Sequence, residues 1–105
     1  MILKALNTLQ EDLGEEIEDF FFSYKAFIRP ENINGAYEVF EFNLISIKRL
    51  MAGFPDVGIM LNRGWMITKF FDEQDVIKKI ICICKEDNHN NTYLKIGTYL
   101  RIQRN

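Results

Sequence analysis

Residues 2–24 read ILKALNTLQEDLGEEIEDFFFSY, and this segment decides the fold that the sequence predicts. Its apolar side chains recur at steps of three and four from Ile2 to Tyr24, a spacing that lines one face of a helix. We therefore expect an amphipathic helix over about residues 3–24. The helix can instead begin at Thr8, a residue type that caps helix N-termini.

Six acidic residues lie opposite the apolar stripe of this predicted helix, and no Lys or Arg lies between Leu6 and Tyr24 to offset them. Glu11 and Glu15, like Asp12 and Glu16, are four residues apart, a spacing at which like charges repel on a helix. One interpretation is a solvent-exposed face, because the helix dipole tolerates acids near the N-terminus. The functional interpretation is a surface that binds a basic partner. The acids are Glu11, Asp12, Glu15, Glu16, Glu18 and Asp19.

The middle of the chain predicts strands. Residues 37–47 are rich in aromatic and β-branched side chains, which favours a strand. The alternation slips near the end of this segment, so a bulge or a change of element is expected there. The same residues also fit a helical stripe that Gly53 would close. Residues 57–61 and 65–71 flank Gly64, which predicts a hairpin with a positive φ at the glycine.

A second helix and a last strand complete the predicted order. Asp72 is typical of a helix N-cap, and a helical stripe follows over residues 76–84, although five β-branched residues there also favour a strand. Residues 93–103 alternate apolar and polar side chains, which predicts a strand. The order α-β-β-β-α-β indicates an α+β fold with helices packed on one antiparallel sheet of about four strands. The length of 105 residues suits a single domain over residues 1–105.

Charge is unevenly distributed along the chain. Residues 1–42 carry nine acids and three bases, whereas residues 43–105 carry ten bases and six acids. The formal net charge of −2 therefore hides two segments of opposite sign. Separated charge acts on the choice of partner and on the rate of association more than on the fold.

The predicted last strand carries a second candidate surface. Aromatic and basic side chains alternate on its outward face, a combination found in protein interfaces and in sites for single-stranded nucleic acid. An ordinary solvent-exposed sheet face is the alternative. A pI of about 5.4 and the lack of an RNA-recognition or zinc-finger signature disfavour nucleic acid. The residues are Tyr93, Lys95, Tyr99 and Arg101.

The residues that could carry metal or catalytic chemistry form no complete set. Cys82, Cys84 and His89 lack the spacing and the fourth ligand of a zinc site. On a helix the two thiols would point roughly 200° apart, whereas in a strand they would share a face. We interpret them as reduced, buried thiols and expect no cofactor. The serines and glycines match no nucleophile or phosphate-binding motif, so we expect no enzymatic activity.

These observations predict a non-enzymatic, cytoplasmic, protein-binding domain. No segment approaches the roughly 20 apolar residues of a membrane span, and the N-terminus lacks a signal-peptide pattern. The abundance of Ile, Asn, Lys and Phe indicates an AT-rich genome, bacterial or phage. The most concrete form of the prediction is a small immunity or inhibitor protein that neutralises a toxin, for example a basic nuclease, through the acidic helix.

Two alternatives belong to other functional classes. The predicted element order resembles, in outline, the small dimeric chaperones of secretion systems, which implies a homodimer that binds an unfolded segment of its partner. Exposed apolar residues on the second helix would support that alternative. A small enzyme, or an accessory protein that binds nucleic acid, is the other; the enzyme would need His89 or the cysteines to converge with acids in a pocket.

Overall fold

The computed structural model describes residues 1–31, 35, 37–57, 63–86, 93 and 96–103. It confirms an α+β fold with a mostly antiparallel sheet, but the chain begins with a strand and the predicted order is wrong. The elements are β1 (Ile2–Leu13), β2 (Phe20–Arg29), β3 (Glu38–Ser46), α1 (Ile47–Val57), β4 (Trp65–Thr68), α2 (Glu73–Glu86), α3 (Ile96–Tyr99) and β5 (Arg101–Ile102).

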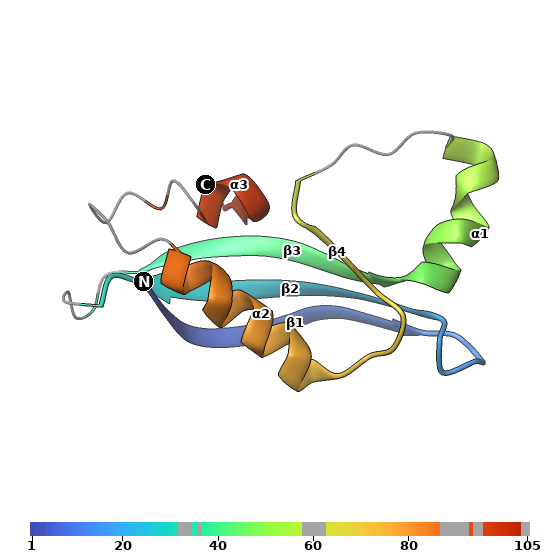
Figure 1. Ribbon diagram of the computed structural model, residues 1–105, viewed down its shortest axis with the longest axis horizontal. Helices are drawn as coiled ribbons and strands as arrows, with labels where there is room; N and C mark the ends of the chain where they lie inside the picture. Colours follow the sequence, from blue (N-terminus) through green and yellow to red (C-terminus); the bar gives the residue numbers. More distant parts are fainter. Residues whose placement is uncertain (32–34, 36, 58–62, 87–92, 94–95, 104–105) are drawn as a thin grey trace.

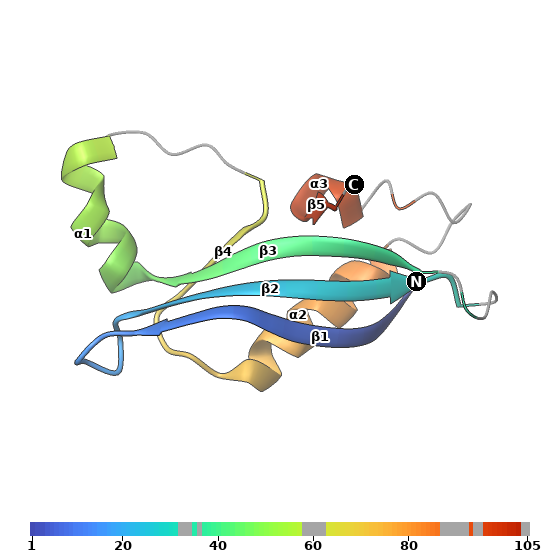
Figure 2. The same ribbon diagram turned by 180° about the vertical axis from the view of Figure 1, so that it is seen from behind.

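The sheet has the strand order β1-β2-β3-β4, and β5 also pairs with β3. The first three strands form an antiparallel meander, whereas β4 runs parallel to β3 and β5 runs antiparallel to it. Figures 1 and 2 show α2 lying across one face of the sheet and α1 extending from the end at which β3 finishes. The core therefore lies between one face of the sheet and the helices α2 and α3.

The predicted helix over residues 3–24 is wrong, since this segment forms β1, a turn and the first half of β2. Every second residue of β2 is buried, namely Phe20, Phe22, Tyr24, Ala26 and Ile28. A period of two places all five side chains on one sheet face, which no helix could do. The strict alternation of apolar residues after the acidic segment is thus a stronger indication of a strand than the spacing of three and four is of a helix.

Two β-bulges explain why the apolar residues of β1 have the spacing of a helix. The register of β1 on β2 shifts between Leu3 and Ala5 and again between Thr8 and Gln10. Each bulge inserts one extra residue, so Leu3 and Leu6 lie opposite Ile28 and Ala26 on the same face although they are three residues apart. A spacing of three, typical of helices, therefore arises in a strand.

The strand predicted over residues 37–47 is confirmed as β3, and its slip in alternation marks a change of element. The hydroxyl of Ser46 accepts hydrogen bonds from the backbone N–H of Phe20 at 3.2 Å and of Arg49 at 3.1 Å. The second bond caps α1, which begins at Ile47 and was not predicted. The alternative helical stripe fits only the residues that follow Ser46.

The second predicted helix is confirmed as α2. The carboxylate of Asp72 accepts a hydrogen bond from the N–H of Gln74 at 3.0 Å, as expected of an N-cap. Four side chains of α2 are buried against the sheet: Val76, Ile80, Ile83 and Cys84. Ile81, which the predicted stripe includes, is instead 39% exposed.

Around Gly64, the predicted positive φ and the predicted strand after it are confirmed, but the predicted hairpin is not. Gly64 has a φ of +84°, and β4 follows it. However, the strand that pairs with β4 in the described residues is β3, and it runs parallel to β4, whereas the two strands of a hairpin are antiparallel. In the predicted partner, residues 57–61, Val57 ends α1 and residues 58–61 lie outside the described residues.

The strand predicted over residues 93–103 is wrong, because this segment contains α3 and the short strand β5. Ile96 and Leu100 are both buried, and the N–H of Leu100 donates to the carbonyl of Ile96 at 2.9 Å. The alternating pattern therefore contains a pair four residues apart that a single helical turn buries together. The resemblance to secretion chaperones rested on the predicted order and loses that basis.

Candidate functional site

The six acids of the N-terminal segment gather at one end of the sheet, not along a helix. Glu11 and Asp12 belong to the last residues of β1, and the other four lie in the turn before β2 (Figure 1). This turn is closed by two backbone hydrogen bonds, from Gly14 to Asp19 at 2.8 Å and from Asp19 to Glu16 at 3.0 Å. The acids therefore occupy a structured hairpin.

Two basic residues from the first turn of α1 bind this hairpin. Arg49 contacts the carboxylates of Asp19 at 2.6 Å and Asp12 at 2.9 Å. Lys48 pairs with Glu16 and, at 3.9 Å, with Glu18. The sequence interval from Leu6 to Tyr24 holds no basic residue, so the cations that offset the acids come from a distant segment.

These contacts also change the pKa of the two bases. The hydrogen bond to Asp19 raises the pKa of Arg49, and the hydrogen bond to Glu16 raises the pKa of Lys48. Both cations therefore stay charged wherever the carboxylates are ionised. In the described part of the chain, Glu11 and Glu15 make no ion pair, so part of the negative charge is not compensated locally.

The pleat of β1 sends its two acids to opposite faces of the sheet. Asp12 reaches Arg49, whereas Glu11 lies opposite Phe22 on the face that α2 covers. Burial raises the pKa of Tyr24 to about 12, and the negative charges of Glu73 and Glu11 contribute to the same shift. The first turn of α2 therefore lies near the end of β1.

The N-terminus of α2 adds three further acids to this end. Phe71 precedes α2 and packs on Phe22, with ring centroids 4.4 Å apart, and on Phe20 at 5.8 Å. We define the acidic end of the molecule as the residues that these contacts bring to one end of the sheet. They are Glu11, Asp12, Glu15, Glu16, Glu18, Asp19, Asp72, Glu73 and Asp75.

Large apolar side chains are exposed among these acids. Ile17, in the hairpin turn, is 81% exposed, and Leu13, at the end of β1, is 64% exposed. Phe70 is 56% exposed in the segment that leads to α2. Sequence reasoning assigned Leu13 and Ile17 to the buried face of a helix and therefore missed them; their position beside Gly14 in an acidic turn was the available signal.

The second candidate surface does not form a continuous stripe. Tyr93 packs on Phe40 at 5.7 Å and its hydroxyl donates to the carbonyl of Ile28 at 3.4 Å. Tyr99 belongs to α3, Arg101 belongs to β5, and Lys95 lies outside the described residues. The prediction that these residues share one strand face is wrong, because α3 interrupts the strand. A role of these residues in binding stays a prediction.

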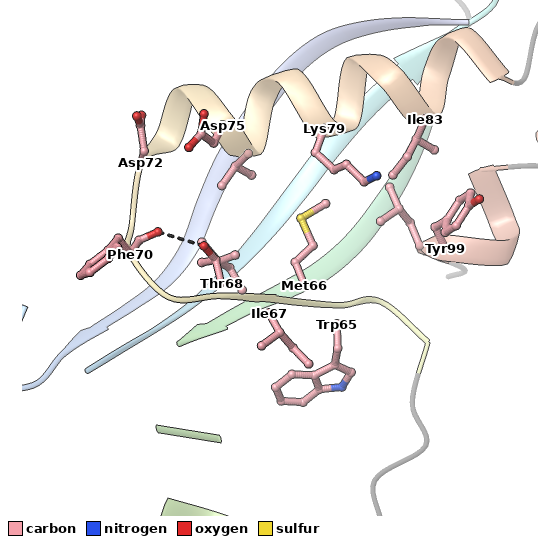
Figure 3. Close-up of a pocket in the computed structure, with 13 residues that line it drawn as sticks. Trp65, Met66, Ile67, Thr68, Phe70, Asp72, Asp75, Lys79, Ile83 and Tyr99 are labelled. Carbon is pink, nitrogen blue, oxygen red and sulfur yellow. Dashed lines mark hydrogen bonds between the residues drawn. The ribbon is translucent and has the colours of Figure 1, made fainter. Parts of the chain in front are cut away.

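A pocket of about 370 Å³ opens between β4, α2 and α3. Figure 3 shows Met66 and Thr68 pointing from β4 toward α2, whereas Trp65 and Ile67 point to the other side of the strand. Leu44, Val76 and Leu100 are among the apolar residues that line it, and its charged lining residues are Asp72, Asp75 and Lys79. The sequence pattern gave no indication of this pocket, because its lining comes from segments that are distant in the chain.

The residues considered for metal binding are separated. Cys82 is exposed and Cys84 is buried, which follows from their spacing on α2. His89 lies outside the described residues. In the described ranges, no group of three or more His, Cys, Asp or Glu side chains is placed to hold a metal ion. Within the same ranges, no helix is both long and apolar enough to cross a membrane.

Comparison with known proteins returns no matching family model, no matching curated protein and no matching solved structure.

Proposed function

We propose that this chain is a non-enzymatic protein-binding domain whose acidic end binds a basic protein. In its most concrete form the proposal is a small cytoplasmic immunity or inhibitor protein of bacterial origin, which neutralises a toxin such as a basic nuclease. The observation that carries the proposal is the combination of excess negative charge and exposed large apolar side chains at one end of the sheet.

The charge balance of the hairpin supports attraction of a basic partner. Its six acids meet two bases, Lys48 and Arg49, which leaves a net charge of −4 in this region. Complementary charge speeds diffusional encounter and disfavours partners of the same sign. The three acids at the start of α2 add to this field.

The exposed apolar residues supply the apolar anchors of an interface, which charge alone does not provide. Protein interfaces usually combine a few buried apolar or aromatic anchors with a polar rim. Ile17 lies between Glu16 and Glu18 in the chain, and Leu13 follows Asp12. Exposed apolar side chains next to carboxylates suit the centre and the polar rim of such an interface. The ion pairs to α1 hold the hairpin in one arrangement, which lowers the entropy cost of binding.

The test is capture of a partner by the immobilised full chain at low salt, followed by elution in rising salt. The test variant is the Glu11→Gln, Glu15→Gln double substitution, because neither side chain makes an ion pair in the described part of the chain. The matched control is Glu31→Gln with Glu38→Gln, which removes the same charge outside the acidic end.

We expect the wild type and the control to retain the same basic protein and to release it as salt rises. The test variant should retain it at least about tenfold more weakly, a difference of about 1.4 kcal/mol. The purified chain should also inhibit the activity of that protein. Equal retention by both variants, an acidic partner, or recovery of only a salt-resistant dimer of the chain would contradict the proposal.

A further inference from the structure

We propose that the pocket between β4, α2 and α3 binds a small amphipathic carboxylate, with the hydrocarbon or aryl body on its apolar lining and the carboxylate on Lys79. The pocket volume of about 370 Å³ falls within the range of about 300–1,000 Å³ that is usual for small-molecule sites. This inference does not depend on the proposed function, because it rests on Lys79 and the apolar lining, although the pocket shares Asp72 and Asp75 with the acidic end.

The inner wall of the pocket is rigid and apolar. Leu44, Val76, Ile83 and Leu100 line it and are at the same time members of the buried core. Met66 contributes a flexible thioether from β4, a side chain that adapts to apolar ligands of different shape. An apolar ligand body placed here would leave water without moving the core.

Lys79 is the cation among the described residues that line the pocket. Figure 3 shows its ammonium group directed from α2 toward the side of the pocket that Ile83 and Tyr99 form. Within the described residues it makes no ion pair, even with Asp75 one turn earlier on the same helix. An unpaired ammonium group beside apolar side chains favours an anionic group on the ligand.

Most other polar groups of the lining already have partners. The hydroxyl of Thr68 donates to the carbonyl of Phe70 at 3.0 Å, and the hydroxyl of Tyr99 lies 3.4 Å from a carboxylate oxygen of Glu86. Asp72 caps α2. Asp72 and Asp75 lie at the N-terminal end of α2, so they confine an anion to the opposite part of the pocket (Figure 3).

One cation among the described lining residues and an apolar wall fit a monoanion better than a phosphate ester. Phosphate sites usually combine several donors, such as a helix N-terminus, a nest of backbone N–H groups or an arginine fork. The start of α2 carries Glu73 and Asp75, which repel a dianion there. The ligand class is therefore a medium-chain or aromatic carboxylic acid in its ionised form.

The experiment compares decanoate with 1-decanol, which has the same chain length and no charge. Binding to the full chain is measured by titration calorimetry, and the site is located from amide chemical shifts by NMR. The test variant is Lys79→Met, which keeps an apolar stem. Lys78→Met is the matched control, because Lys78 is the adjacent lysine of α2 and does not line the pocket. Lys79→Arg restores the charge.

We expect saturable binding of decanoate to the wild type, with the largest shifts at Met66 and Val76. Lys79→Met should weaken decanoate binding about tenfold and leave 1-decanol binding unchanged, while Lys78→Met and Lys79→Arg should bind decanoate like the wild type. Three results would each overturn the proposal: no saturable binding by the folded wild type, shifts confined to another surface, or equal loss in Lys78→Met and Lys79→Met.

Discussion

The first hairpin depends on the lack of a side chain at Gly14. A Cβ atom at this position would lie 2.6 Å from Cγ and 2.9 Å from Cβ of Asp19, closer than non-bonded carbon atoms approach. Asp19 cannot simply rotate away, because its carboxylate is bound to Arg49 at 2.6 Å. The glycine therefore allows the turn and the ion pair to exist together.

We expect Gly14→Ala to lower the free energy of unfolding by about 1–3 kcal/mol, the usual cost of forcing a group into occupied space. The control is Gly53→Ala in α1, where an added Cβ meets no atom within 4 Å. That substitution should be neutral or stabilise by up to about 1 kcal/mol, because alanine favours helix. Urea denaturation measures both, and equal effects would refute the role assigned to Gly14.

Because of Tyr24, we expect the free energy of unfolding to change with pH in the alkaline range. Its phenol is buried, and its pKa rises from 10.0 to about 12, chiefly because burial disfavours the phenolate. A pKa that is higher in the folded state stabilises the fold below pH 10, and this contribution is lost as pH rises through about 12. The neighbouring charges of Glu73 and Glu11 act in the same direction.

We therefore expect the free energy of unfolding to fall between pH 10 and 12, and to fall less steeply in Tyr24→Phe. In a spectroscopic titration of the phenols, a transition near pH 12 should be present in the wild type and missing from Tyr24→Phe. Tyr37→Phe is the control, because Tyr37 is 46% exposed. Identical pH dependence in wild type and Tyr24→Phe would show that Tyr24 is not the source.

At the level of elements, α1 stabilises a hairpin from which it is distant in sequence. Its first turn follows β3 directly, so Lys48 and Arg49 project beside the turn that joins β1 and β2. The positive charges are poorly placed with respect to the dipole of α1, since a helix N-terminus favours anions. The carboxylates of the hairpin offset this, so helix and hairpin stabilise one another.

We expect Arg49→Met to lower the free energy of unfolding by about 1 kcal/mol or less, because solvent screens a partly exposed pair. The effect should exceed that of Lys48→Met, since the Arg49 side chain is 25% exposed and that of Lys48 is 45% exposed. Chemical denaturation at low and high salt measures this difference, which should shrink as salt rises. A larger loss in Lys48→Met, or no salt dependence, would contradict this account of the hairpin.

At the scale of the whole molecule, the charge division of the sequence is rearranged by folding. The acidic N-terminal segment meets Lys48 and Arg49 from the basic part of the chain, and the same end receives Asp72, Glu73 and Asp75. The acidic end therefore contains residues from both the acidic segment 1–42 and the basic segment 43–105. The pocket lies between β4, α2 and α3 and shares Asp72 and Asp75 with the acidic end, but its inner wall is apolar.

Local signals predicted part of this structure well. The strand β3, predicted over residues 37–47, and the Asp72 cap of α2 were recognised because each depends on neighbours in sequence. One is an alternation within a single strand, and the other is a carboxylate two residues before a free N–H. The α+β class follows from such elements. The excess of acids was likewise visible, since charge is a property of composition.

Contacts between distant segments determined the rest. Residues 2–24 satisfy a helical spacing because two bulges mimic it, and they become strands when α2 covers the alternating aromatic residues of β2. The hairpin ion pairs join residues 30 or more positions apart, and the pocket joins three elements. A hydrophobic pattern shows which side chains need burial but not which partner buries them, and that choice is made by the packing of the whole chain.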